Sequence, residues 1–310
     1  MGQPGRVVVL GVFVADTAYR ADRQPRMGET VLGRGFALGP GGKGSNQAVA
    51  AARVGAETHF ITRLGRDAFA DMALRTWAQA GVIPAVTQAA GGYTGAAYIF
   101  IEAATGDNAI IICPGVAADI SAADVEAQAA LIGGAAVFVT QLEQPVEAAL
   151  AALRLARRGG ARTVLNPAPA APLPEGMLAL CDFVTPNESE AEALTGLPVH
   201  DPAAAEAAAR ALRAMGAGAA VVTLGAQGAL YHDGDATLHL PAFDAGAVAE
   251  TTGAGDAFNG GFAAALARGL PPPEAARYGC AVAAISVTRP GTAPSMPTAA
   301  EVAALLARAR

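Results

Sequence analysis

Residues 251–260 read TTGAGDAFNG, a glycine-rich turn that leads into an apolar segment. Phe258, Phe262 and Leu266 follow at helical spacing, which predicts a helix over residues 255–268. The first turn of a helix exposes backbone N–H groups, and these act with the helix dipole to favour a negatively charged group. This stretch therefore predicts a phosphate site at the start of a helix.

Asp256 stands in the first turn of this predicted helix. An acidic residue there can simply complement the helix dipole. Beside a phosphate site, its carboxylate could instead accept the proton of an incoming hydroxyl, while the amides of Gly253, Ala254, Gly255 and Asp256 hold the transferring phosphoryl group. The residues alone leave both interpretations open.

A second glycine-rich segment, GPGGKGSNQA, occupies residues 39–48. It is not a Walker A loop, because Gly44 stands where Ser or Thr is required. The glycines are either turn residues or a means of close backbone approach to a polyhydroxylated ligand, where Asn46 can both donate and accept. Gly260 and Gly261 also indicate close backbone approach, because glycine in a helix costs roughly 1 kcal/mol relative to alanine.

Together the two segments resemble the signatures of the ribokinase family of carbohydrate kinases, and the similarity runs from about Val7 to about Pro297. The resemblance implies an α/β fold in which a parallel sheet carries helices on both faces and a small β-sheet forms a lid. It also implies ATP-dependent phosphorylation of a pentose at its terminal hydroxyl, with Asp256 as general base and Mg²⁺ bound with the phosphates. D-ribose is the first expectation for the sugar.

Three alternatives remain beside this interpretation. A kinase for 2-deoxyribose or another small sugar would share these motifs. A non-catalytic sensor of sugar and nucleotide could use the same fold, although the intact segment 253–256 argues against it. A nucleotide-dependent dehydrogenase is disfavoured, because no G-x-G-x-x-G follows the first predicted strand.

Composition limits the partners and the location. The chain has 310 residues, 53% hydrophobic and 15% charged, which favours one well-buried domain over residues 1–310. A net charge of −6 gives no basic surface for nucleic acid or an anionic membrane. Three cysteines at unrelated spacings predict buried free thiols. No apolar run reaches 18 residues, so we expect no membrane span and a cytoplasmic protein.

Strand and helix patterns alternate along most of the chain, which implies a parallel sheet with ligands beyond the carboxyl ends of its strands. Segments 16–38 and 92–113 instead predict a small separate sheet, the lid, whose exposed edges could pair between subunits to give a homodimer. The predicted strands are 6–14, 58–62, 137–140, 163–166, 183–185 and 219–224, with a hairpin across 233–235. The predicted helices are 45–54, 68–80, 145–158, 188–194, 203–215, 255–268, 273–288 and 298–308.

The resemblance assigns the sugar site to Asp16, Gly42, Lys43, Asn46, Glu143 and Asp256, together with Val14. Asp16 and Glu143 are each predicted at a strand end, where a carboxylate can accept from two neighbouring hydroxyls. Either one alone is more often a solvated loop acid. Val14 departs from the family, which carries asparagine there. Valine can neither donate nor accept, so either one sugar hydroxyl loses its partner or water fills the gap.

The resemblance places the nucleotide near Asn187, Thr223, Gly225, Gly228, Gly255 and Cys280. Asn187 and Glu190 also fit a helix capping box, and Glu190 matches the family carboxylate that organises magnesium and phosphate; both roles can hold. Thr223 begins either a plain hairpin turn or the ATP-binding turn. Cys280 stands where the family carries a histidine near the adenine.

An activating potassium ion is implied at two loops that would ligate it largely through backbone carbonyls. The matching residues are Glu250, Thr252, Ser286, Arg289, Gly291 and Ser295. Ligation by oxygen alone suits a hard cation. Glu250 stands where the family carries aspartate, one methylene shorter, which leaves potassium activation open.

Overall fold

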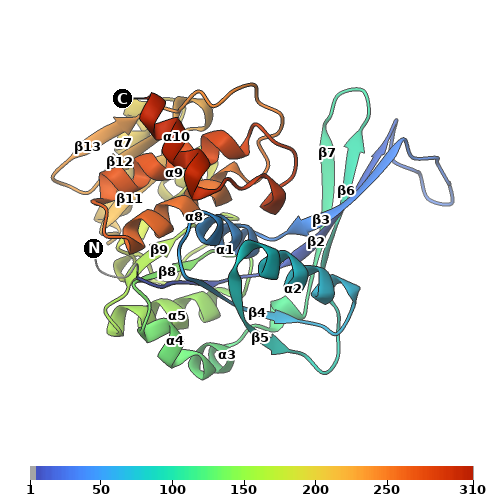
Figure 1. The fold of residues 1–310 in the computed structure, drawn as a ribbon, viewed down its shortest axis with the longest axis horizontal. Coiled ribbons are helices and arrows are strands. Elements are labelled where there is room, and N and C mark those ends of the chain that lie inside the picture. The colour runs from blue at the N-terminus through green and yellow to red at the C-terminus, as the bar shows by residue number, and fades with distance from the viewer. Residues whose placement is uncertain (1–4, 310) are drawn as a thin grey trace.

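A computed structural model describes residues 5–309, and a nine-stranded sheet forms its centre (Figure 1). The strand order is β13-β12-β11-β10-β9-β8-β1-β4-β5. All neighbours from β11 to β5 pair in parallel, and β12 and β13 add an antiparallel edge. The strands are β1 (Val7–Leu10), β4 (Thr58–Leu64), β5 (Val82–Gln88), β8 (Val137–Thr140), β9 (Arg162–Leu165), β10 (Phe183–Val184), β11 (Ala219–Thr223), β12 (Ala229–His232) and β13 (Thr237–Leu240).

Helices cover both faces of this sheet, so the expected layering is confirmed. One face carries α1 (Lys43–Arg53), α2 (Ala68–Ala80), α8 (Ala254–Ala267), α9 (Pro272–Ser286) and α10 (Ala299–Arg308). The other carries α3 (Ala122–Ala127), α4 (Ala129–Gly133), α5 (Val146–Arg158), α6 (Glu188–Thr195) and α7 (Pro202–Ala214). Within residues 5–309, no helix is long and apolar enough to cross a bilayer.

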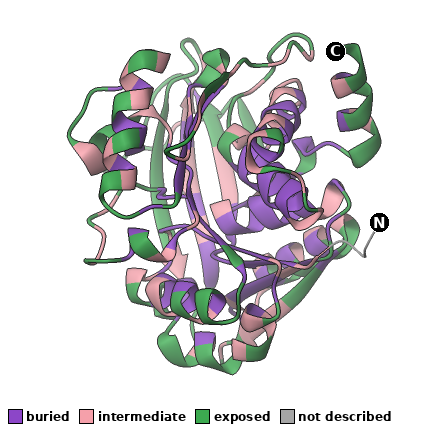
Figure 2. Ribbon diagram, turned by 90° about the vertical axis from the view of Figure 1, so that its left-hand side faces the viewer, coloured by how far each residue is buried: buried purple, intermediate pink, exposed green. Residues whose placement is uncertain are grey.

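The central strand β1 shows why its sequence is continuously apolar. Val7 and Val9 pack into the core on the α8 side, whereas Val8 and Leu10 pack into the core on the α5 side. Successive side chains of a strand point to opposite faces, so a strand covered on both faces needs apolar residues at every position. Figure 2 shows this buried layer between helices whose outer faces are exposed.

A separate four-stranded sheet projects from the body, in the order β3-β2-β6-β7 (Figure 1). Its strands are β2 (Val14–Ala21), β3 (Gly35–Gly41), β6 (Thr94–Glu102) and β7 (Asn108–Gly115). Segments 16–38 and 92–113 therefore contribute to one small sheet, as expected. We call these four strands the small sheet.

Several sequence-based predictions need correction. The apolar run 6–14 is not one strand: β1 ends at Leu10, and Val14 already begins β2. Strand β5 was missed because it lies at the sheet edge, where Pro84 is tolerated and half-exposed side chains blur the apolar pattern. The short helices α3 and α4 were also missed. Cys181 and Cys280 are buried as expected, but Cys113 on β7 is exposed.

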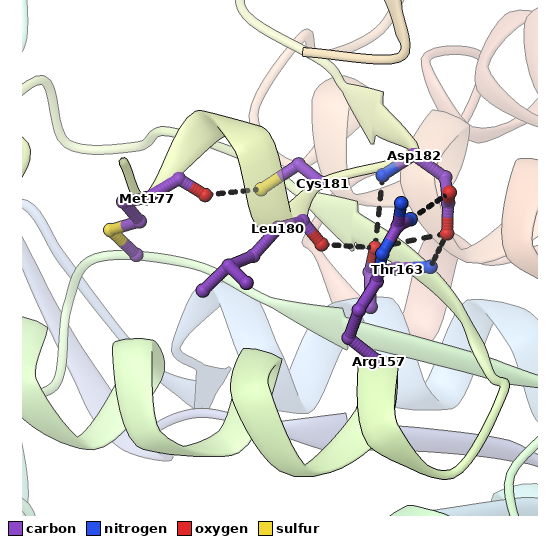
Figure 3. A network of polar contacts seen from close by, with 6 residues as sticks. All are labelled: Arg157, Thr163, Met177, Leu180, Cys181 and Asp182. Atoms are coloured by element: carbon purple, nitrogen blue, oxygen red, sulfur yellow. Dashed lines mark hydrogen bonds and ion pairs between the residues drawn. The ribbon is translucent and has the colours of Figure 1, made fainter. Parts of the chain in front are cut away.

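A polar network fixes the amino ends of β9 and β10 (Figure 3). The Asp182 carboxylate accepts from the backbone N–H of Thr163 at 2.9 Å and pairs with Arg157 of α5. The Asp182 amide donates to the Thr163 hydroxyl at 2.9 Å, and that hydroxyl donates to the carbonyl of Leu180 at 2.6 Å. These bonds hold the two strands in register at the end opposite their functional carboxyl ends.

Candidate active site

Two helices begin at the same place, beyond the carboxyl ends of the central strands. Helices α1 and α8 pack closely because Gly260 faces α1: an added Cβ would lie 2.5 Å from both the Gln47 carbonyl oxygen and Ala50 Cβ. On the other side of α8, a Cβ at Gly261 would lie 2.6 Å from Val282 of α9. The close approach expected at both glycines is confirmed, and it brings the two glycine-rich segments together.

Asp256 is the buried centre of this arrangement, with 7% of its surface exposed. Its Oδ2 accepts from Asn46 Nδ2 at 3.0 Å, and its Oδ1 accepts from Gln47 Nε2 at 3.0 Å. Burial raises the pKa of Asp256, against the opposing effects of the Lys43 ammonium and the two amide donors. The carboxylate is thus held by fixed donors in a low-dielectric site.

Further ionisable groups surround Lys43. Burial raises the pKa of Glu143 to about 7. Burial and the charge of Asp256 raise the pKa of Asp16 to about 6. Burial lowers the pKa of Lys43, but the charges of Asp256, Glu143 and Glu190 more than offset this, so its pKa is raised. One cation thus faces several carboxylates.

The residues assigned to the sugar lie around the start of α1. Glu143 follows β8, as predicted, and its Oε2 accepts from the Lys43 backbone N–H at 2.7 Å. The predicted position of Asp16 needs correction, because this residue lies on β2 of the small sheet and not at the end of a main-sheet strand. Its carboxylate lies over Gly41, where an added Cβ would come within 2.2 Å of Asp16 Oδ2. The Oδ1 of Asn46 is buried without a partner in residues 5–309, so it can accept from a ligand.

Gly42 and Val14 complete this side. Gly42 precedes α1 with φ +87°, and an added Cβ would lie 2.5 Å from the Val12 carbonyl oxygen, so only glycine fits there. Val14 is buried and pairs with Gly41 across β2 and β3. Since Val14 and Asp16 are two residues apart on one strand, their side chains lie on the same face of the small sheet.

A cavity of about 150 Å³ adjoins Asp256 and the first turn of α8. No side chain caps α8, whose N-cap is Gly253 in the left-handed region. Of the four expected amides, that of Ala254 already donates to the Thr251 carbonyl. The amides of Gly253, Gly255 and Asp256 have no partner among residues 5–309, and they can bind an anion in the cavity. The cavity is lined by Lys43, Asn166, Ala168, Thr185, Asn187, Glu190, Thr223, Gly253, Gly255, Asp256 and Asn259.

Of the residues assigned to the nucleotide, some line the cavity and others do not. Asn187 and Glu190 form the predicted capping box of α6, with bonds of 2.8 and 2.9 Å, and both also line the cavity. Thr223 lines it too, and the turn with Gly225 and Gly228 links β11 to β12. Cys280 is buried in α9 and is not among the lining residues.

The two loops assigned to potassium lie together. Glu250 Oε2 accepts from the Gly291 N–H at 2.8 Å, so its longer side chain reaches the second loop. The Ser286 hydroxyl, at the end of α9, donates to the Ala283 carbonyl of that helix, and the Ser295 hydroxyl donates to the Thr292 carbonyl. Arg289 pairs with Glu301 of α10, and Thr252 is exposed just before α8. Among residues 5–309, no three His, Cys, Asp or Glu side chains gather as metal ligands, so a cation here would need backbone carbonyls.

Sequence reasoning missed four polar residues of the site. Asn166 and Thr185 directly follow β9 and β10, the strand ends where open α/β sheets bind ligands, so their positions carried a usable signal. Asn259 lies in α8, where Thr185 Oγ1 donates to its Oδ1 at 2.6 Å. Gln47 is a polar residue in an apolar stretch of α1, and it is fully buried.

Comparisons with known proteins agree with this geometry. A family model described as pfkB family carbohydrate kinase matches residues 5–299. The chain is 38% identical to a ribokinase of Haemophilus influenzae, over 98% of this chain and 99% of the relative. It is 36% identical to a deoxyribokinase of Salmonella typhimurium, over 94% and 95%. A solved ribokinase of Arabidopsis thaliana, in complex with ribose and ATP, is 29% identical with a TM-score of 0.91, covering 98% and 99%. The expected fold class is therefore confirmed.

We expect Glu143 to make stability depend on pH. Its pKa rises from the ordinary 4.5 to about 7 in the folded protein, so this group's stabilising contribution is complete below about pH 4.5 and is lost as the pH rises through 7. Glu143→Gln keeps an acceptor for the Lys43 N–H but does not titrate. Between about pH 4.5 and 8, its free energy of unfolding should rise relative to wild type by up to about 3 kcal/mol.

Urea denaturation across this pH range measures the difference. A free-energy difference that does not change with pH would contradict the raised pKa of Glu143.

Proposed function

The chain belongs to the pfkB family of carbohydrate kinases, and on this basis we propose that it transfers the γ-phosphoryl group of ATP to the terminal hydroxyl of D-ribose, giving ribose 5-phosphate. One observation carries the proposal: a buried carboxylate, Asp256, lies beside three unpartnered amides and a cavity that Lys43 also lines. This arrangement combines a proton acceptor with an anion site. The ribokinases among its relatives and structural neighbours support the choice of sugar.

The residues divide the reaction between them. Asp16, Glu143 and the free Oδ1 of Asn46 would accept from sugar hydroxyls and orient the sugar. Asp256 takes the proton of the terminal hydroxyl as that oxygen bonds to the γ-phosphorus, while the bond from phosphorus to the ADP oxygen breaks. The amides of Gly253, Gly255 and Asp256 donate to the transferring group. A base whose pKa is raised by burial holds a proton more readily at neutral pH than an exposed aspartate.

Two cations belong to the proposal. Glu190 would organise the water ligands of a magnesium ion that enters with ATP, and this ion would supply positive charge beside the phosphates. Potassium would bind carbonyls of the loops joined by Glu250 and Gly291. We also place the enzyme in the cytoplasm, where its three free cysteines would stay reduced.

Asp256→Asn should lower kcat for ribose by about 10²–10⁴-fold and leave ribose binding largely intact, because the amide cannot take the proton. A coupled assay of ADP release with ribose and ATP measures turnover. Asp182→Asn is the matched control, since it makes the same change in the network of Figure 3, at the far end of the strands. A wild type without turnover of any sugar would favour the sensor alternative, and a variant that keeps more than about a tenth of kcat would remove Asp256 from the role of base.

A kinase that accepts 2-deoxyribose is the second candidate, because Val14 lies on the same face as Asp16 and the relatives include a deoxyribokinase. A polar residue at position 14 would be left unpaired by a deoxy sugar, at roughly 1–3 kcal/mol. Valine avoids that cost and gains nothing from the natural hydroxyl. We therefore expect a weaker preference for ribose than in an asparagine-bearing relative.

Val14→Asn should shift kcat/KM toward ribose by up to about tenfold for each 1.4 kcal/mol regained. Steady-state kinetics with both sugars measure this shift, and Val14→Leu controls for a change of size without polarity. If the wild type strongly prefers ribose and Val14→Asn leaves the ratio unchanged, position 14 does not contact the sugar.

The small sheet would close over the sugar, because it carries Asp16 while Glu143 and Asp256 belong to the body. Its opposite face is apolar: the Tyr19 ring lies 5.1 Å from Phe36 and 5.5 Å from Tyr98, and Ile111 pairs with Tyr98. Phe36 is 61% exposed and Ile111 is 62% exposed. We propose that this face joins two copies of the chain in a homodimer.

Light scattering should show a dimer for the wild type and a monomer for Phe36→Asp combined with Ile111→Glu. Met215→Asp, at an exposed apolar residue outside the small sheet, should stay dimeric. A wild-type monomer at assay concentration would contradict the homodimer.

A further inference from the structure

A group of buried amide side chains lies behind the Asp256 carboxylate. Gln47 of α1 donates from Nε2 to Asp256 Oδ1 and to Asn166 Oδ1, each at 3.0 Å. Its Oε1 accepts from Gln141 Nε2 at 2.6 Å. Gln47 and Gln141 are fully buried, and Asn166 is 6% exposed. The three amides come from a helix and from the carboxyl ends of two strands.

These bonds allow only one orientation of the Gln47 amide. Both of its N–H donors and its carbonyl oxygen are in use. Rotating the amide by 180° would set Oε1 against the oxygens of Asp256 and Asn166, and Nε2 against the Gln141 amide nitrogen. Asn166 is fixed in turn, because its Nδ2 donates to the Thr185 carbonyl at 3.0 Å. The network therefore presents a donor to Asp256 and never an acceptor.

Gln141 anchors this network through close packing. A Cβ added at Gly11 would lie 2.4 Å from Gln141 Oε1, and a Cβ added at Gly44 would lie 2.9 Å from the same atom. The Gln141 side chain is thus wedged between the end of β1 and the start of α1. Gln47 is not among the cavity-lining residues, unlike Asp256 and Asn166. Asn46, the other donor to Asp256, keeps a free oxygen for a ligand, whereas the amide nitrogen and oxygen of Gln47 already bond to protein groups.

We propose that Gln47 is a positioning residue: held by Gln141 and Asn166, it fixes the plane of the Asp256 carboxylate for proton transfer. It acts through Asp256 and does not touch the reactants. The inference rests on the proposed role of Asp256 as base. Asp256 accepts hydrogen bonds from the uncharged amides of Gln47 and Asn46. The charged groups that act on it are Lys43 and the carboxylates of Asp16, Glu143 and Glu190.

Kinetics of Gln47→Met test the proposal, because methionine fills a similar volume without donors. We expect kcat to fall by about 10–100-fold with little change in the KM for sugar. The acidic limb of the pH–rate profile should move to higher pH, because the ionised carboxylate loses a donor. Gln141→Met should cause a smaller change in the same direction. The double variant should be no worse than Gln47→Met alone, because Gln141 acts through Gln47.

Gln144→Met is the matched control. Gln144 is also buried. Its side-chain amide donates to the Thr140 hydroxyl and to the backbone carbonyl of Gln141, but not to Asp256. Gln144→Met should lower the free energy of unfolding without moving the acidic limb of the pH–rate profile. An acidic limb that coincides with that of wild type in Gln47→Met would overturn the positioning role. If that variant does not fold, the same comparison with Gln141→Met decides.

A second measurement needs no turnover. The pKa of Asp256 is raised on folding, so the wild type should lose stability relative to Asp256→Asn as the pH rises through the folded pKa. In the Gln47→Met background this loss should be larger and centred at a higher pH. An unchanged profile would overturn the inference. Absence of ribose turnover in the wild type would instead contradict only the proposed function.

Discussion

The structure depends on holding one carboxyl group, that of Asp256, inside a packed core. Asp256 lies where α1 and α8 both begin, so two helix dipoles and fixed amide donors face it. An isolated buried charge would be neutralised by a large shift in its pKa. Lys43, Asn46 and Gln47 oppose that shift, and all three belong to the first turn or so of α1. The position of α1 against α8 is therefore the constraint that the rest of the fold must satisfy.

Small residues meet this constraint. Ala50 and Ala51 of α1 are fully buried against Gly260 of α8, which lets the two helix backbones approach closely. Larger side chains would separate the helices, and about 1 Å of displacement at a catalytic group can cost about 10²-fold in rate. The alanines of these helices thus serve close packing, whereas Phe262 of α8 and Trp77 of α2 are large side chains that are fully buried.

Short sequence patterns predicted the features of the site that lie within one stretch of the chain. The turn before α8, the segment before α1 and the capping box of Asn187 lie in short stretches of sequence, and each is where we expected it. Gln47 contacts Gln141 and Asp256 across 94 and 209 positions, so no periodicity could reveal its role. The break within 6–14 was hidden because the chain stays buried as it crosses between sheets. In edge strand β5 the apolar run is interrupted by Pro84 and does not match the burial of its side chains.

Charge balance links the small sheet to the loops around Glu250. Glu143, Glu190 and Asp256 face Lys43, and Asp16 lies near Asp256. Burial raises the pKa of all four carboxyl groups. On the proposed function, ATP would bring further negative charge, so cations must enter with it or bind nearby. The Thr292 hydroxyl donates to the Pro40 carbonyl at 2.7 Å, and Pro40 pairs with Ala15, next to Asp16, across β3 and β2. A cation held near Gly291 would therefore lie close to the strand pair that carries Asp16.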